Sequence, residues 1–396
     1  MNYSTPEADS AWLETGFVAD LDSLAAYFER LPDQRCARGK RYRLGQICIL
    51  AVLAKLSGED HPLGIAQWAQ LRQAVLGPLL GLSKRLPCHN TYRRVLSAGI
   101  RTADLDQHVS AFLRQRPRAG QSVLIVFDGK TLRGTIPTGQ SQGVHLLAAY
   151  LPAEGIVLMQ VAVPNKDNEI VAAPQLLAQL DLRGKIIIGD ALHTQRALSV
   201  QILAGEGDFV WLVKDNQPTL REDIEQAFQL ERLVKGFSPL VTDFQSARSV
   251  DKGHGRHEER RLTASSLFNE YLDWPGVAQV FKLERRTVRL ATGEGRHEVV
   301  YGLTSLSATQ ATPKRLLSLV RQYWGIENGL HYRRDQSLHE DATRIGNPSL
   351  AQNMATLNNL IVGLVLTNGW RYLPEARRYY ASSLSAALQL VFQAPG

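Results

Sequence analysis

Two short apolar runs, each followed by an aspartate, constrain the fold of this chain more than any other feature. Residues 122–127 read SVLIVF before Asp128, and residues 185–189 read KIIIG before Asp190. Near-continuous β-branched and aromatic residues are typical of strands that are buried on both faces. Similar patterns predict strands at 145–151, 156–163 and 208–214, with helices at 168–180 and 194–203. The order of three strands, helix, strand, helix, strand predicts a mixed α/β sheet.

The rest of the chain divides around this sheet. Residues 1–19 read as a tail, 20–118 as a helical N-terminal domain, and 119–214 as the first part of the core. Alternating segments with turn signals predict a β-rich insertion over 215–298. A strand at 299–306 opens the second part of the core, 299–346, and residues 347–396 form C-terminal helices. The predicted fold class is α/β, a mixed sheet interrupted by a β-rich insertion and flanked by helices.

The two aspartates suggest a metal site. In a parallel sheet, sites collect beyond the carboxyl ends of the strands, so neighbouring strands would bring Asp128 and Asp190 together. Two carboxylates about 4 Å apart repel by roughly 4 kcal/mol at an effective dielectric of 20. A divalent cation removes this repulsion, and oxygen ligands suit Mg²⁺ and Mn²⁺. For one aspartate taken alone, a helix N-cap or a turn is the simpler interpretation.

A third carboxylate lies in the stretch 316–334, LLSLVRQYWGIENGLHYRR. Helical spacing there predicts one stripe, made of Leu316, Val320, Tyr323, Glu327, Leu330 and Arg334. A carboxylate on an apolar face needs a cationic partner. Two hypotheses follow: a buried pair between Glu327 and Arg334, or a metal ligand that joins the two aspartates. Two metal ions about 3.5–4 Å apart can activate a water or a sugar hydroxyl for attack on a phosphodiester.

Six motifs in this order carry a family resemblance: FDGKTLRGT (127–135), GDALHTQ (189–195), VKDNQPTL (213–220), HGRHEER (254–260), YWGIENGLHYRRD (323–335) and HEDATRI (339–345). Together they resemble the ISAs, or H-repeat-associated, family of insertion-sequence transposases. The N-terminal stretch FERLPDQRCARGKRYRLG resembles the helical domain associated with that family. The resemblance implies an RNase H-like core and an Asp-Asp-Glu triad at Asp128, Asp190 and Glu327. These three residues would be the ligands of two Mg²⁺ ions, with Mn²⁺ as the alternative.

Several basic residues are candidate DNA contacts. Lys130 and Arg133 follow Asp128 in a glycine-flanked loop, and Lys214 follows the last core strand. The wider group of these transposases has the signature Tyr-x2-Arg-x3-Glu-x6-Lys around its glutamate. Arg334 stands at the position of the final lysine, and Arg321, on another helical face, is the candidate to replace the arginine that is absent from its position. His331 would orient Glu327 or touch phosphate, or simply pack in the core. Arg93 and Arg94 lie on a short basic helix, which fits either a DNA-reading module or a plain helical bundle.

Composition agrees with a DNA partner. The net charge is +7, and arginine outnumbers lysine by about three to one, a balance that favours polyanions and bidentate phosphate contacts. Cys36, Cys48 and Cys88 form no metal-ligand spacing. No signal peptide precedes the first helix and no apolar run reaches about 20 residues. We therefore expect a bacterial cytoplasmic protein, associated with the nucleoid and not with membranes.

These observations predict a cut-and-paste DNA transposase. It would bind the terminal inverted repeats of an insertion sequence, cleave the DNA by two-metal hydrolysis and join the free 3′-hydroxyl to target DNA. Concerted cutting at two ends implies at least a homodimer on DNA. Two alternatives stay open: an inactive DNA-binding relic, and an RNase H-like nuclease that cuts without strand transfer.

Overall fold

The computed structural model describes residues 20–38, 40–82, 85–115, 123–163, 168–233, 243–253 and 255–394. The predicted tail, 1–19, lies outside the described residues. The chain forms two compact units that are discontinuous in sequence. Unit 1 comprises residues 1–122, 129–166 and 327–396, and unit 2 comprises 123–128 and 167–326. The chain therefore passes between the units directly after Asp128 and again directly before Glu327.

Unit 1 is built on helices from both ends of the chain. Helix α3 is apolar on all sides, and such a helix is stable only when it is buried; every one of its residues is buried. It contacts α2, α4, α12, α13 and α14. The helices of unit 1 are α2 (Leu24–Glu29), α3 (Leu44–Leu56), α4 (Pro62–Leu71), α5 (Gln73–Leu79), α6 (His89–Arg94), α7 (Thr102–Arg114), α12 (Pro348–Thr367), α13 (Leu373–Ser382) and α14 (Leu384–Phe392).

Helix α12 is the second core helix of unit 1. Asn347 caps its N-terminus by accepting a hydrogen bond from the Leu350 amide at 2.8 Å, and Pro348 takes the first turn. By length and composition α12 is the one helix in the described residues that could span a membrane, but 83% of its most apolar window is buried inside the protein. It packs against α7 and strand β3 (Ile156–Val163).

A polar network ties α12 to α7 and β3. The Asp106 carboxylate accepts hydrogen bonds from Gln160 Nε2 at 2.9 Å and from Thr356 Oγ1 at 2.5 Å. Asn359 Nδ2 donates to Gln160 Oε1 at 2.8 Å. Burial, as the largest influence, raises the pKa of Asp106 to about 7, while the hydrogen bonds from Thr356 and Gln160 oppose this rise.

The strands have the order that the sequence predicts. The sheet order begins with β3, β2 (His145–Leu151) and β1 (Leu124–Thr131), and β2 is antiparallel to β3. In unit 2, β1 pairs in parallel with β4 (Ile186–Gly189), which pairs in parallel with β5 (Asp208–Val213). Helices α8 (Glu169–Leu177) and α9 (Arg196–Ala204) connect these strands. This mixed sheet confirms the predicted RNase H-like fold class.

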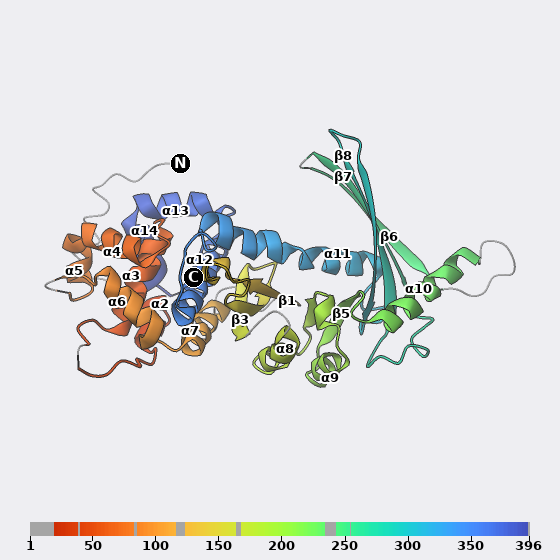
Figure 1. Cartoon of the computed structure of the whole chain (residues 1–396), viewed down its shortest axis with the longest axis horizontal. Coiled ribbons are helices and arrows are strands. Elements are labelled where there is room, and N and C mark those ends of the chain that lie inside the picture. Colours follow the sequence, from red (N-terminus) through yellow and green to blue (C-terminus); the bar gives the residue numbers. More distant parts are fainter. Residues whose placement is uncertain are drawn as a thin grey trace. The chain divides into compact units, whose positions relative to one another are not determined.

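The insertion is a continuation of the same sheet. Strands β6 (Gln245–Gly253), β7 (Arg256–Ser265), β8 (Gln279–Arg289) and β9 (Gly295–Thr304) are antiparallel neighbours, and Figure 1 shows the first three as long curving strands. The end of β9 also pairs with β5, at Tyr301 to Thr304. Helix α10 (Pro218–Leu233) precedes the insertion, and helix α11 (Pro313–Tyr323) packs against β6 and β7. The insertion therefore extends the edge of the core sheet.

The helix predicted over 316–334 is present, but its second half consists of π-helical turns. Helix α11 ends at Tyr323, and π-helical turns follow at η5 (Glu327–His331) and η6 (Arg333–Ser337). A π-turn carries an extra residue, which shifts side chains relative to 3.6-residue spacing. Five members of the predicted stripe are buried, namely Leu316, Val320, Tyr323, Leu330 and Arg334, whereas the side chain of Glu327 is 63% exposed.

The Asp106 network predicts a specific pH dependence of stability. The pKa of Asp106 is raised above its unfolded value, so folded Asp106 holds a proton that the unfolded chain releases between about pH 4 and 7. The free energy of unfolding should therefore fall as pH rises through that window, by on the order of 2–4 kcal/mol. In Asp106→Asn this contribution should vanish, which chemical denaturation at several pH values measures. Identical pH profiles for both proteins would contradict the assignment.

Candidate active site

The parallel pairing of β1 with β4 ends at Val126 and Ile188 in unit 2, and β1 itself continues to Thr131, so Asp128 lies within β1 and not at its end as the apolar run predicts. Their register pairs Leu124 with Ile186 and Val126 with Ile188. Continued by two residues, the same register sets Asp128 level with Asp190. Neighbouring strands lie about 4.8 Å apart, so the two aspartates start from adjacent backbone positions. Both are half-buried.

The loop that follows β4 holds Asp190 in place. Asp190 Oδ1 accepts a hydrogen bond from the Leu192 amide at 2.9 Å and caps the short 3₁₀ turn η4 (Ala191–His193). Asn216 Nδ2 donates to the carbonyl of Ala191 at 2.5 Å, and Gln217 Nε2 donates to that of Thr194 at 3.0 Å. The amides after β5 therefore fix this loop, and the N-cap role of Asp190 leaves Oδ2 for another contact.

The buried side chain of His193 supports the same loop from inside the protein. Its ring is fully buried and meets Phe127 edge-on at 6.1 Å between centroids. Its Nε2 lies 3.3 Å from the buried carboxylate of Glu169. A Cβ added at Gly189 would lie 2.8 Å from the imidazole, so the last residue of β4 must be small. His193 thus supports the backbone on both sides of Asp190.

Glu327 opens the first π-turn in unit 1, together with His331. His331 Nδ1 lies 3.7 Å from Glu327 Oε2, and the imidazole is buried. The hydrogen bond from His331 lowers the pKa of Glu327, and the positive charges of His331 and Lys130 lower it further, against the effect of burial. Glu327 therefore stays ionised, with an exposed carboxylate whose oxygens could bind a cation. Of the three interpretations of His331, namely orienting Glu327, touching phosphate and packing in the core, this geometry favours the first.

Within unit 1, Asp335 and the HEDATRI segment (339–345) hold the loop after Asp128 through ion pairs and hydrogen bonds. Lys130 Nζ binds both carboxylate oxygens of Asp335 at 2.7 Å and lies 3.8 Å from Asp341. The Arg133 amide donates to Asp341 Oδ1 at 3.1 Å, and the Ile345 amide donates to the carbonyl of Gly134 at 3.1 Å. Burial raises the pKa of Asp335, while Lys130 opposes this rise. Lys130, predicted as a phosphate contact, is thus buried and forms an ion pair with Asp335.

Arg334 is also a partner inside the protein. Its side chain is 1% exposed, and its guanidinium binds Glu340 at 2.7 to 3.0 Å. Asn358 Nδ2 donates to the same carboxylate at 2.8 Å. The hypothesis of a buried pair between Glu327 and Arg334 is therefore wrong, because Arg334 pairs with Glu340. The burial also leaves Arg334 without the access that its predicted DNA contact requires.

The other predicted DNA contacts differ in exposure. Arg133 is 79% exposed and only 3.8 Å from Asp341, and Lys214 is exposed without an ion pair among the described residues. Arg321 pairs with Asp251 at 3.0 Å. Arg93 and Arg94 are exposed on α6. Arg133, Lys214, Arg321, Arg93 and Arg94 are accordingly the predicted cations whose side chains are exposed.

Sequence reasoning missed the acidic partners. Glu169, Asp335, Glu340 and Asp341 were assigned no role, although the last two belong to the quoted HEDATRI motif. The signal available was charge balance. A motif rich in acids that carries no ligand role is expected to neutralise cations that a second motif holds nearby.

Comparison with known proteins decides the family. The model of the transposase DDE domain matches residues 119–364, and that of the DDE_Tnp_1-associated domain matches residues 25–113. This chain belongs to the DDE transposase family. The family consists of enzymes that act on DNA. The predicted resemblance of the chain to H-repeat-associated transposases is confirmed.

Two relatives align with this chain over most of their own length. The transposase is 26% identical to the "H repeat-associated putative transposase YhhI" of Escherichia coli K12, over 91% of this chain and 94% of that protein. It is 32% identical to an "uncharacterized protein in dhlA 3′region" of Xanthobacter autotrophicus, over 68% of this chain and 91% of that one. A piggyBac transposase synaptic complex with hairpin DNA aligns at a TM-score of 0.43 and 11% identity, over 94% and 80% of the two chains.

The Arg334–Glu340 pair predicts a stability effect. Arg334→Ala should lower the free energy of unfolding by about 3–5 kcal/mol, because Glu340 remains buried without its cation. The double variant Arg334→Met/Glu340→Leu should recover most of that loss, since it removes both charges. Chemical denaturation measures both. Normal stability of Arg334→Ala, together with weakened DNA binding, would contradict this prediction and support the predicted DNA contact of Arg334 instead.

Proposed function

We propose that this DDE transposase cleaves DNA at the ends of an insertion sequence and joins the freed 3′-hydroxyl to target DNA. Asp128, Asp190 and Glu327 are proposed as its catalytic residues and as the ligands of two Mg²⁺ ions, with Mn²⁺ as a substitute. The observation that carries the proposal is the register of β1 and β4, which sets two aspartates level just beyond the paired segment of two parallel strands.

The chemistry of the donor set fits a hard divalent ion. All three side chains offer carboxylate oxygens, the ligands that Mg²⁺ and Mn²⁺ prefer. Level carboxylates at Asp128 and Asp190 would repel one another without a cation between them. Glu327 is kept ionised by His331, as a ligand must be. The chain crosses between its two units directly after Asp128 and directly before Glu327, so both acids begin at unit boundaries.

The residues of this chain divide the remaining work. When bound, the ions lower the pKa of a water or a 3′-hydroxyl and stabilise the leaving oxygen. The Leu192 amide and the loop behind it hold Asp190 in one orientation. Arg133 and Lys214 are proposed to bind phosphates near the scissile bond, since guanidinium and ammonium groups are the usual phosphate partners. The N-terminal helical domain is proposed to bind the terminal inverted repeats through Arg93 and Arg94, with at least two protomers on the DNA.

Replacement of one ligand should separate chemistry from binding. Asp128→Asn should reduce cleavage of end-labelled element DNA by at least roughly 10³-fold and leave end binding unchanged, because the amide keeps the shape but loses the charge. Asp181→Asn is a matched control: Asp181 is an exposed aspartate of the same unit that binds only Arg183. Normal cleavage by Asp128→Asn would exclude it as a ligand.

The products of the same assay separate the proposed function from its alternatives. Joined molecules, in which a labelled element end is covalently linked to target DNA, support transposition. Nicked ends without joining would indicate a nuclease, and bound DNA without cleavage an inactive relic. The substrate is the DNA that flanks the gene, where short inverted repeats should mark the element ends.

Metal binding can be tested without any DNA. Saturating Mn²⁺ should raise the melting temperature of the wild-type protein, because a ligand that binds only the folded state stabilises it, by about 2.7 kcal/mol at 100 times its Kd. Asp128→Asn and Asp190→Asn should lose this shift, and Asp181→Asn should keep it. Equal shifts in all four proteins would place the ion elsewhere.

A further inference from the structure

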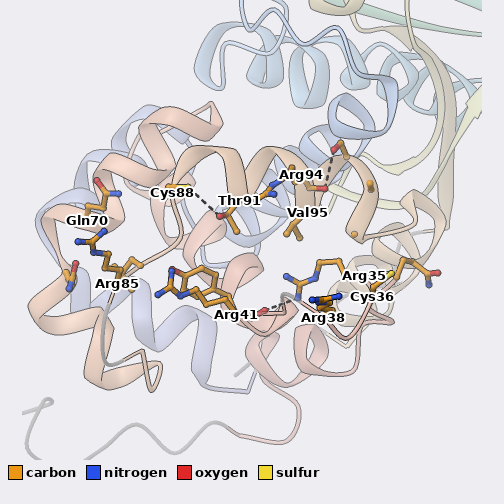
Figure 2. Close-up of a pocket in the computed structure, with 17 residues that line it drawn as sticks. Arg35, Cys36, Arg38, Arg41, Gln70, Arg85, Cys88, Thr91, Arg94 and Val95 are labelled. Atoms are coloured by element: carbon orange, nitrogen blue, oxygen red, sulfur yellow. Dashed lines mark hydrogen bonds between the residues drawn. The ribbon is translucent and has the colours of Figure 1, made fainter.

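An arginine-lined hollow opens on the N-terminal helical part of unit 1. It has a volume of about 1140 Å³. Figure 2 shows Cys88, Thr91 and Arg94 along the helix formed by α6 and the π-turn η1 (Val95–Gly99) on one side of it. On the other side lies the loop that carries Arg38 and Arg41. Gln70 and Arg85 lie at one end.

The hollow holds uncompensated positive charge. Among its lining residues, Arg35 is neutralised by Asp33, with contacts of 2.8 and 2.9 Å. Arg38, Arg41, Arg85 and Arg94 have no ion pair in the part of the chain that the structure describes. None of the described side chains that line the hollow is acidic. Several like charges that face one space repel each other, so a bound anion would stabilise this arrangement.

The chemistry of the lining selects the class of ligand. Pockets for small molecules are mostly apolar and occupy about 300–1,000 Å³. This hollow is larger, and it presents guanidinium groups together with neutral donors. Guanidinium groups bind phosphates in pairs of hydrogen bonds, and amides and hydroxyls add further phosphate contacts. The neutral polar side chains of the lining include Gln34, Gln70, Gln73 and Thr91. A polymer with repeated phosphates is therefore the ligand that this lining fits.

The helix beside the hollow has an exposed edge of a second kind. Asn90, Arg93 and Arg94 are exposed on α6, while Tyr92 is buried beneath them. This edge also borders a second hollow of about 530 Å³, lined by Asn90, Arg93 and Asn347. Asparagine and arginine are the side chains that read adenine and guanine through paired hydrogen bonds in the major groove. The edge therefore offers base-reading groups next to phosphate-binding ones.

We propose that this hollow holds the sugar–phosphate backbone of duplex DNA through Arg38, Arg41 and Arg85, while Asn90 and Arg93 on the adjoining helix edge read bases in the major groove. The inference rests on the proposed function, since the DNA held here is the element end that is to be cut. It adds the surface that holds the duplex and divides its residues into phosphate-binding and base-reading groups.

The salt dependence of binding tests the phosphate contacts. The full-length protein is titrated in a chelator with a fluorescein-labelled duplex of mixed sequence, about three helical turns long. Each lost phosphate contact lowers the slope of log K against log salt by about 0.9, so Arg41→Gln/Arg85→Gln should lower it by about 2. Affinity near 0.1 M salt should fall on the order of tens of fold.

Matched variants keep this test interpretable. Arg371→Gln/Arg378→Gln removes two exposed arginines of the same unit outside the hollow and should leave the slope unchanged. Arg41→Lys/Arg85→Lys preserves charge and should retain most of the slope. A wild-type slope for Arg41→Gln/Arg85→Gln would overturn the proposal. Equal competition by single-stranded RNA of the same length would overturn its assignment to duplex DNA.

The cysteines provide a readout that needs no substitution. Cys36 and Cys88 are exposed and line the hollow, whereas Cys48 is buried and burial raises the pKa of its thiol to about 12. Cys48 should resist iodoacetamide throughout and serves as the internal control. A saturating duplex should slow alkylation of Cys36 and Cys88 severalfold. Unchanged alkylation rates in bound protein would count against the hollow as the DNA-binding surface.

Base reading is tested separately. Asn90→Ala should leave the salt slope unchanged but reduce the preference for the element-end duplex over mixed sequence by roughly tenfold. An undiminished preference would remove Asn90 from the reading edge. Because all binding is measured in a chelator, these results are independent of chemistry. Cleavage with an unchanged slope would sink only the inference, and an altered slope without cleavage would sink only the proposed function.

Discussion

The parallel pairing of β1 with β4 is the constraint on which the candidate site depends. Each strand is a buried apolar run, so its register is set by packing on both faces and a slip of one residue is costly. That register sets Asp128 level with Asp190. Around it, His193, Gly189 and the amides of Asn216 and Gln217 hold the backbone that carries the second aspartate. The polar site thus takes its geometry from apolar packing.

Much of the fold could be predicted because its signals are local. β2 and β3 occupy the residues that their apolar patterns predict, 145–151 and 156–163, and α3 spans 44–56. The aspartates could be found because an apolar run ends at each of them, although β1 continues past Asp128 to Thr131. In each case the periodicity of a short segment decides the structure, and tertiary contacts reinforce that local preference.

What could not be predicted depends on contacts between distant segments. Arg334 was expected beside Glu327 at helical spacing, but π-turns rotate the helix and Glu340 takes the guanidinium instead. The sequence predicts Lys130 as a phosphate contact, but in the structure Lys130 pairs with Asp335. A basic residue in a sequence carries no record of which acid reaches it after folding. The arginines of the N-terminal hollow illustrate the opposite case, since there the described residues supply no acid to most of them.

The pairing of β9 with both β5 and β8 has a consequence for the solubility of the folded chain. An open sheet is vulnerable along its outermost strand, where unpaired amides and carbonyls invite another chain to associate. Without β9, β5 would be that outermost strand, and it is among the most apolar segments of the protein. The residues of β9 that pair with β5, Tyr301 to Thr304, lie in the second part of the core, and the earlier residues of β9 pair with β8 of the insertion. β9 therefore shields an apolar rim that would otherwise favour aggregation.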